Sequence, residues 1–239
     1  MSDPIVALAP GVYRIGTLGN FINTFVFNEP DGSITLVDCG LKMAPGPIVR
    51  GLSIIGKHPN DVGRIVLTHA HDDHLGGAAE MITAAGLKGA AMHAADAAFV
   101  RAGALPPRDR STTAGRIFAR IPDRHYAPFE VTEVLTDGQL IDVAGGLRVI
   151  HTPGHTPGHI SLLHESTGVL ITGDSIFNIG SRLTWALSAF CTSYDQSKAT
   201  AALFGDLDFD IAAFTHGPEI RNKARERIRT FLTRRGARP

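Results

Sequence analysis

The 239-residue chain has little cysteine, no net charge and no long apolar run. Two cysteines exclude a disulfide-stabilised scaffold and suit a reducing compartment. Because 23 basic residues balance 23 acidic ones, the composition gives no sign of a nucleic-acid or membrane-surface partner. No apolar segment is long enough to cross a bilayer. These absences direct attention to a small-molecule substrate.

The start of the chain lacks the pattern of an export signal. Asp3 stands where a signal peptide would carry basic residues, so we expect a cytoplasmic protein. The 44% apolar and 19% charged residues are ordinary for a folded domain and exclude disorder. No Gly- or Ser-rich linker divides the sequence, which therefore predicts a single α/β domain over residues 1–239.

Histidine, in contrast, is plentiful, with 11 residues, and several of them form a cluster. The motif His69-Ala70-His71-Asp72-Asp73-His74 follows a short apolar strand over residues 64–67 and precedes a helix that we expect from Leu75. On a connecting loop these side chains can converge on one point. Imidazole and carboxylate together are the ligand set of zinc, or of iron or manganese. The motif therefore predicts a metal site.

Three later segments repeat this arrangement of a strand, a glycine and a candidate ligand. The strands over residues 147–150, 169–171 and 211–214 lead into His155, Asp174 and His216 respectively. An α/β framework gathers its sites at such strand ends. Further strands are expected within residues 5–37 and over 131–135 and 160–163. Helices are expected within residues 94–120, broken at 105–107, and also from residue 193 and after residue 218.

Residues 176–194 are expected to form a long, irregular and apolar segment. It suits a substrate wall, an oligomer contact such as a homodimer interface, or a segment that folds back on the core. Arg182, its only charged residue before Tyr194, is a candidate partner for a substrate carboxylate. Tyr194 is the phenol that a lactonase would place near its metals.

The set formed by the His69–His74 motif, His155, Asp174 and His216 resembles, in order and spacing, the metallo-β-lactamase superfamily. The resemblance implies a four-layer αββα sandwich, the metallo-β-lactamase fold. It implies a first metal held by His69, His71 and His155, and a second held by Asp73, His74 and His216, with Asp174 bridging both. It also suggests that Asp38 supports the metal loop, although a turn-forming aspartate explains that residue equally well.

From this resemblance we predict a dinuclear zinc hydrolase with two Zn²⁺ per chain, iron or manganese being the alternatives. A metal-bound hydroxide would attack a carbonyl, with Asp73 as the catalytic residue that orients it. Thioesters and lactones are the favoured substrates. A β-lactamase, or an iron-dependent oxidoreductase or dioxygenase of the same fold, remains an alternative. The basic segment 219–239 is interpreted as a solvated helix end and not as a nucleic-acid site. His159 is interpreted as a core histidine, with support of the metal site as the other reading.

Overall fold

The computed structural model describes residues 4–120 and 126–234. His125 and the last five residues of the basic segment, 235–239, therefore lie outside the described residues. The strands are β1 (Ile5–Ala9), β2 (Val12–Leu18), β3 (Ile22–Asn28), β4 (Ile34–Val37), β5 (Val62–Val66), β6 (Ala90–His93), β7 (Val131–Leu135), β8 (Leu140–Ile141), β9 (Leu147–His151), β10 (Ile160–His164), β11 (Val169–Ile171), β12 (Ile176–Ile179), β13 (Arg182–Trp185) and β14 (Ile211–Ala213).

The helices are α1 (Pro45–Ile54), α2 (Asp72–Leu75), α3 (Ala78–Ala84), α4 (Ala94–Ala102), α5 (Thr113–Phe118), α6 (Tyr194–Ala201) and α7 (Ala224–Arg234). Short 3₁₀ turns are η1 (Pro59–Asp61), η2 (Gly173–Ser175), η3 (Ser188–Phe190) and η4 (Ala202–Gly205). No helix within the described ranges is long and apolar enough to cross a membrane.

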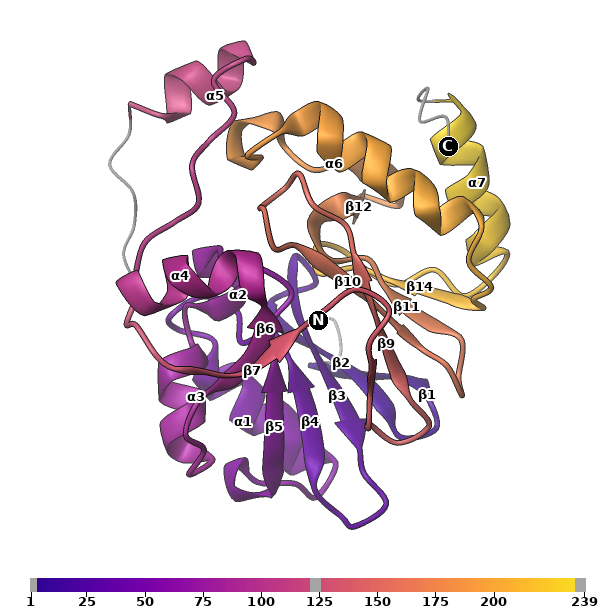
Figure 1. Cartoon of the computed structure of the whole chain (residues 1–239). Helices are drawn as coiled ribbons and strands as arrows, with labels where there is room; N and C mark the ends of the chain where they lie inside the picture. The colour runs from indigo at the N-terminus through magenta and orange to yellow at the C-terminus, as the bar shows by residue number, and fades with distance from the viewer. Residues whose placement is uncertain (1–3, 121–125, 235–239) are drawn as a thin grey trace.

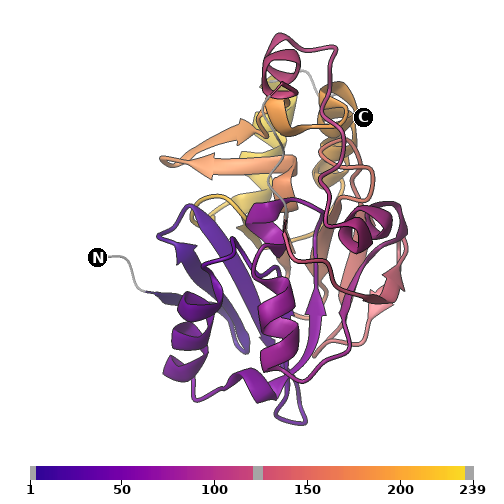
Figure 2. The same ribbon diagram turned by 90° about the vertical axis from the view of Figure 1, so that its left-hand side faces the viewer.

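Two sheets form the centre of the fold. The first contains seven strands in the order β1 to β7, antiparallel up to β4 and parallel from there. The second has the order β14-β11-β10-β9-β8, with β14 parallel to β11. Helices α1 and α3 lie outside the first sheet, and α6 and α7 lie outside the second (Figure 1). Figure 2 shows the N-terminal and C-terminal halves of the chain lying against each other.

Alternating side chains explain these layers. In β3, Val26 points into the cluster shared with α1 and α3, whereas Phe25 and Phe27 point into the cluster between the two sheets. In β11, Ile171 also faces the space between the sheets, and Leu170 faces the cluster shared with α7. Because strand side chains alternate between faces, each sheet is apolar on both sides. The expected four-layer αββα sandwich is the observed fold.

Two expectations about local structure were wrong. The helix expected from Leu75 begins three residues earlier and breaks at Gly76 and Gly77. A Cβ at Gly76 would meet the Asp72 carbonyl oxygen at 2.4 Å, and one at Gly77 the Cys39 carbonyl oxygen at 2.5 Å. Asp73 and His74 therefore lie on helix α2 and not on a loop. The segment expected to be irregular begins with a β12–β13 hairpin, whose tight turn uses positive φ angles at Gly180 and Ser181.

Candidate metal centre

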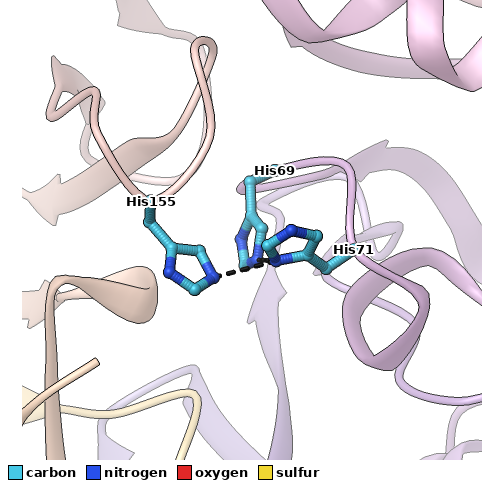
Figure 3. Close-up of side chains that lie close together, drawn as sticks. All are labelled: His69, His71 and His155. Carbon is cyan, nitrogen blue, oxygen red and sulfur yellow. Dashed lines mark hydrogen bonds between the residues drawn. The ribbon is translucent and has the colours of Figure 1, made fainter. Parts of the chain in front are cut away.

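The strand ends bring the predicted residues together at one edge of the two sheets. His69 and His71 follow β5, and His155 lies in the loop between β9 and β10 (Figure 3). The Nδ1 atom of His71 lies 3.1 Å from Nε2 of His69 and 2.9 Å from Nε2 of His155. All three side chains are buried. Three imidazole nitrogens thus face one point, as in a three-histidine metal site.

A second group of donors lies beside the first. Asp73 and His74 come from α2, and His216 follows β14. The Nε2 atom of His216 lies 3.3 Å from Asp73 Oδ2, and Nε2 of His74 lies 3.7 Å from Asp73 Oδ1. The donor atoms of these three residues all lie within 4.8 Å of one another. The group matches the second ligand set that the sequence predicted.

Asp174 lies between the two groups. Its Oδ1 is 3.2 Å from Nε2 of His74, and its Oδ2 is 3.2 Å from Nε2 of His155 and 3.3 Å from Nε2 of His216. One carboxylate therefore contacts imidazoles of both groups, which is the position that a bridging ligand requires. The structure thus brings all seven predicted residues into one cluster.

Contacts on the outer side of the imidazoles fix which nitrogen faces the centre. Because a carboxylate or carbonyl oxygen can only accept, His74 Nδ1–H donates to Asp38 (2.9 Å), and His216 Nδ1–H donates to the Phe21 carbonyl (3.0 Å). His155 Nδ1 lies 3.5 Å from Cys191 Sγ. In His74 and His216 the proton on Nδ1 faces outward, so Nε2 is the nitrogen that faces the centre and could bind a metal there.

Asp38 supports the metal loop, which settles the two readings of this residue. Its carboxylate accepts the Thr68 N–H and the Thr68 hydroxyl, both at 2.8 Å, in addition to His74. The Thr68 oxygen in turn lies 3.0 Å from Nδ1 of His69. Asp38 adopts a φ of 61°, a conformation costly for a residue with a side chain, and these hydrogen bonds hold it there.

Sequence reasoning missed Asp96, at the start of α4. This fully buried carboxylate accepts the N–H groups of Ala70 (2.9 Å) and Gly158 (2.6 Å) and the hydroxyl of Thr156 (2.6 Å). It thereby joins the loop that carries His69 and His71 to the loop that carries His155. Only a gap in the apolar pattern of the Ala-rich segment could have indicated it.

His159 both belongs to the core and supports the site. Its Nδ1–H donates to the Thr152 carbonyl (3.0 Å), and its Nε2 accepts the backbone N–H of Asp174 (2.8 Å). Burial lowers the pKa of His159 to about 3, so the ring is neutral and can accept. The Asp174 loop therefore rests on a fixed imidazole.

The imidazoles of the cluster differ in the direction in which their pKa values are shifted. Burial lowers the pKa values of His69 and His71 well below the ordinary value, so both rings are neutral. Burial also opposes protonation of His155 and His216, but the Asp174 carboxylate outweighs it and raises their pKa values to about 10 and about 9. Without a metal, protons thus balance the buried carboxylates.

The donor set fits a metal ion. His74 Nε2 is buried among the cluster residues and has no hydrogen-bond partner, although it lies close to two carboxylates. An unpaired buried nitrogen is costly unless it binds something. Converging imidazole lone pairs and carboxylate oxygens are the donors expected for a first-row divalent cation.

A cavity of about 210 Å³ opens onto this cluster. It is lined by Phe21, Phe177, Leu187 and Phe190, together with cluster residues. The segment 176–194 therefore supplies a wall of the pocket, while its Leu183 and Trp185 pack on the core beside α7. Part of the segment thus forms a pocket wall, and another part folds back on the core.

The two other candidates from this segment lie elsewhere. Arg182 lines a separate hollow beside α7, together with Arg227 and Phe231, and is not among the residues that line the metal pocket. The structure therefore gives no support to a contact between Arg182 and a substrate in this pocket. Tyr194 is also absent from the pocket lining; its ring packs against Lys198, whose Nζ lies 4.4 Å from the ring centroid.

The remaining described histidines lie outside the cluster, as expected. The rings of His93 and His151 stack with their centroids 3.9 Å apart. His164 is held by the Ala144 carbonyl and Thr167, and His58 precedes the 3₁₀ turn η1.

Comparison with known proteins identifies the family to which the sequence is similar. A family model described as the metallo-beta-lactamase superfamily matches residues 18–217. The uncharacterized protein YobT of Bacillus subtilis is 28% identical over 219 residues, which cover 88% of this chain and 89% of YobT. The family match includes every residue of the metal cluster.

Other relatives share shorter regions or the fold. A hydroxyacylglutathione hydrolase of Cereibacter sphaeroides is 34% identical over 136 residues, or 56% of this chain and 41% of that protein. The match thus spans less than half of that hydrolase. The crystal structure of the metallo-beta-lactamase family protein TTHA1429 from Thermus thermophilus superposes with a TM-score of 0.72 at 26% identity, covering 97% of this chain and 81% of that one.

Proposed function

The chain belongs to the metallo-β-lactamase superfamily, and we propose that it is a dinuclear metal-dependent hydrolase of carbonyl ester-type bonds, with thioesters or lactones as substrates. The observation that carries the proposal is the pair of donor groups that share Asp174 and face one pocket. A closed structural metal site needs no such cavity.

The residues divide naturally between two metal positions. His69, His71 and His155 would hold one ion, and Asp73, His74 and His216 the other, with Asp174 between them. Zinc is the metal that this donor set favours. When bound, two such ions supply Lewis acidity toward a carbonyl and activate water at neutral pH.

The chain itself supplies positioning and a hydrogen-bond acceptor. Asp73 lines the pocket, and its side chain is 28% exposed, the most open of the seven. The charge of His74, which lies against this carboxylate, keeps its pKa well below the usual range despite the effect of burial. The carboxylate is therefore charged at neutral pH and can accept a hydrogen bond from water at the pocket floor, the orienting role proposed for it.

Thioesters are favoured over β-lactams for two reasons. One relative, 34% identical over 136 residues, is named as a hydroxyacylglutathione hydrolase. The only residue proposed to bind a lactam carboxylate, Arg182, lines a different hollow. A lactone presents the same kind of carbonyl and remains the second substrate class.

The test combines metal analysis with a substrate screen on the same purified protein. We expect two zinc ions per chain and hydrolysis of a thioester or a lactone in preference to β-lactams and phosphodiesters. His71→Ala should lose one metal and the activity. His93→Ala, which lies outside the cluster, should keep the full metal content and the activity. A chromophore with bound iron, or full activity and metal content in His71→Ala, would contradict the assignment.

A further inference from the structure

The pocket wall opposite the metal ligands is apolar although it is open to solvent. Phe21 is 52% exposed, Leu187 60% and Phe190 37%. Scattered exposed apolar residues are ordinary, but these three line one cavity together with the buried Phe177. Such a wall beside a polar cluster is typical of a ligand site in which a few polar groups orient an apolar ligand.

The wall is built from segments that are distant in sequence. Phe21 lies in the turn between β2 and β3, Phe177 on β12, and the other two residues at η3. Behind Phe190, the Phe118 ring of α5 packs edge-on with its centroid 5.4 Å away. The rings of Phe21 and Phe177 pack against His216, at 5.2 and 4.5 Å between centroids. These contacts place the apolar wall next to the donors.

The charged groups that line the pocket all belong to the metal cluster. Within the described ranges, no lysine or arginine lines this cavity. Arg108 has its guanidinium 6.0 Å from the Phe190 ring centroid, but it donates to the Phe118 carbonyl and lines a separate hollow with Pro106 and Pro107. Away from the metal cluster, a substrate group in the pocket therefore meets apolar carbon, and an anionic group at this wall would find no lysine or arginine.

We propose that this cavity is an acyl-binding subsite for an uncharged, apolar acyl group attached to the scissile carbonyl. The proposal rests on the proposed hydrolase function and specifies its substrate. At about 210 Å³ the cavity is smaller than the ~300–1,000 Å³ of sites for drug-sized ligands. It has room for roughly seven groups of the size of a water molecule, at about 30 Å³ each. The fitting acyl group has about four to eight carbons.

The first arm of the test is a chain-length series of acyl thioesters with one small neutral thiol, from acetyl to dodecanoyl. Each methylene that enters the pocket should raise kcat/KM about fourfold, until the cavity is filled. Analogues of equal length that end in a carboxylate should react more slowly by at least tenfold. A rate that does not change with chain length would overturn the proposal. A preference for the carboxylate analogues would also overturn it and would point to Arg108 as the partner of the carboxylate.

The second arm measures binding without hydrolysis. Straight-chain methyl ketones keep the acyl chain and the carbonyl but carry a methyl group in place of the thiol leaving group. They cannot be hydrolysed, so calorimetry with the metal-loaded protein gives their dissociation constants. Tighter binding with length in a protein that hydrolyses neither thioesters nor lactones would retain the subsite and refute the hydrolase. Length-independent ketone binding would refute the subsite, whatever the activity.

Leu187→Lys is the decisive variant, because the exposed side chain can be replaced without disturbing the core. It should weaken binding of the longest ketone that fits by at least tenfold and reduce discrimination against carboxylate analogues. Leu203→Lys is the matched control, since Leu203 is also an exposed leucine, 46% accessible, but lies on η4 outside the pocket. It should leave both series unchanged.

Discussion

Asp96 is the residue on which the alignment of the two main histidine loops depends. Asp96→Asn is nearly isosteric but replaces one carboxylate oxygen by an NH₂ donor. The Ala70 N–H bonds to Oδ2 and the Gly158 N–H to Oδ1, so either orientation of the amide sets one backbone donor against another donor. The substitution therefore removes an acceptor from a fully buried site.

The cost follows from these contacts. A stranded buried donor costs about 1–3 kcal/mol, and the remaining hydrogen bonds weaken because their acceptor is no longer charged. Burial raises the pKa of Asp96, which shows that the carboxylate itself is costly to bury. We therefore take the middle of the range, a loss of about 2 kcal/mol in the free energy of unfolding. Misalignment of the loops should also weaken metal binding about 10- to 100-fold.

Two assays separate these effects: chemical denaturation of the metal-free protein and a zinc competition titration. Asp61→Asn is the control, because Asp61 accepts one backbone N–H, that of His58, away from the cluster. The control should lose about 1 kcal/mol or less and keep its metal affinity. A stable Asp96→Asn variant, or a destabilised one with wild-type metal affinity, would show that the loops align without this carboxylate.

Four further outcomes are expected. Cys191→Ala removes the partner of His155 Nδ1 and should lower zinc affinity about tenfold in the same titration. Cys39→Ala is the control and should leave zinc affinity unchanged. Gly173→Ala would place a Cβ 2.4 Å from His159 Nε2 at a φ of 54°, and thermal unfolding should show a loss of about 2 kcal/mol or more. Because His155 and His216 hold protons up to pKa values of about 10 and about 9, zinc must displace them, and its affinity should rise with pH by about tenfold per unit for each proton released. In the metal-free protein these two groups stabilise the fold fully below pH 6.5, and that contribution should disappear as the pH rises through about 9 to about 10.

The candidate ligands carry a partly local signal, and the resemblance to the family supplied their division between two metals. Four of the seven lie within six residues, and each of the others stands beside a glycine after an apolar strand. The strand order then brings these ends to one edge of the fold. Few roles besides metal binding gather imidazole and carboxylate groups at such positions. The core layers were equally readable, because β3 and β11 alternate between two apolar environments.

The supporting residues were not predictable, because their partners are distant in sequence. Asp96 bonds to positions 26, 60 and 62 residues away, and nothing near it marks that role. The β12–β13 hairpin does carry a local signal, a Gly180-Ser181 pair between two short apolar runs, and this signal favours a turn over an irregular segment. The place of Arg182 shows the same limit, since its neighbours Leu183 and Trp185 on β13 pack against residues of α7 that are distant in sequence.

The backbone and the side chain of Phe21 have separate roles at the site. The backbone carbonyl of residue 21 orients the imidazole, and any amino acid at that position offers the same carbonyl. The side chain of the same residue forms part of the apolar wall. Substitutions at position 21 can therefore alter which molecules are accepted while the hold on His216 persists. Such an arrangement lets a lineage exchange one substrate for another by single mutations without passing through a metal-deficient intermediate.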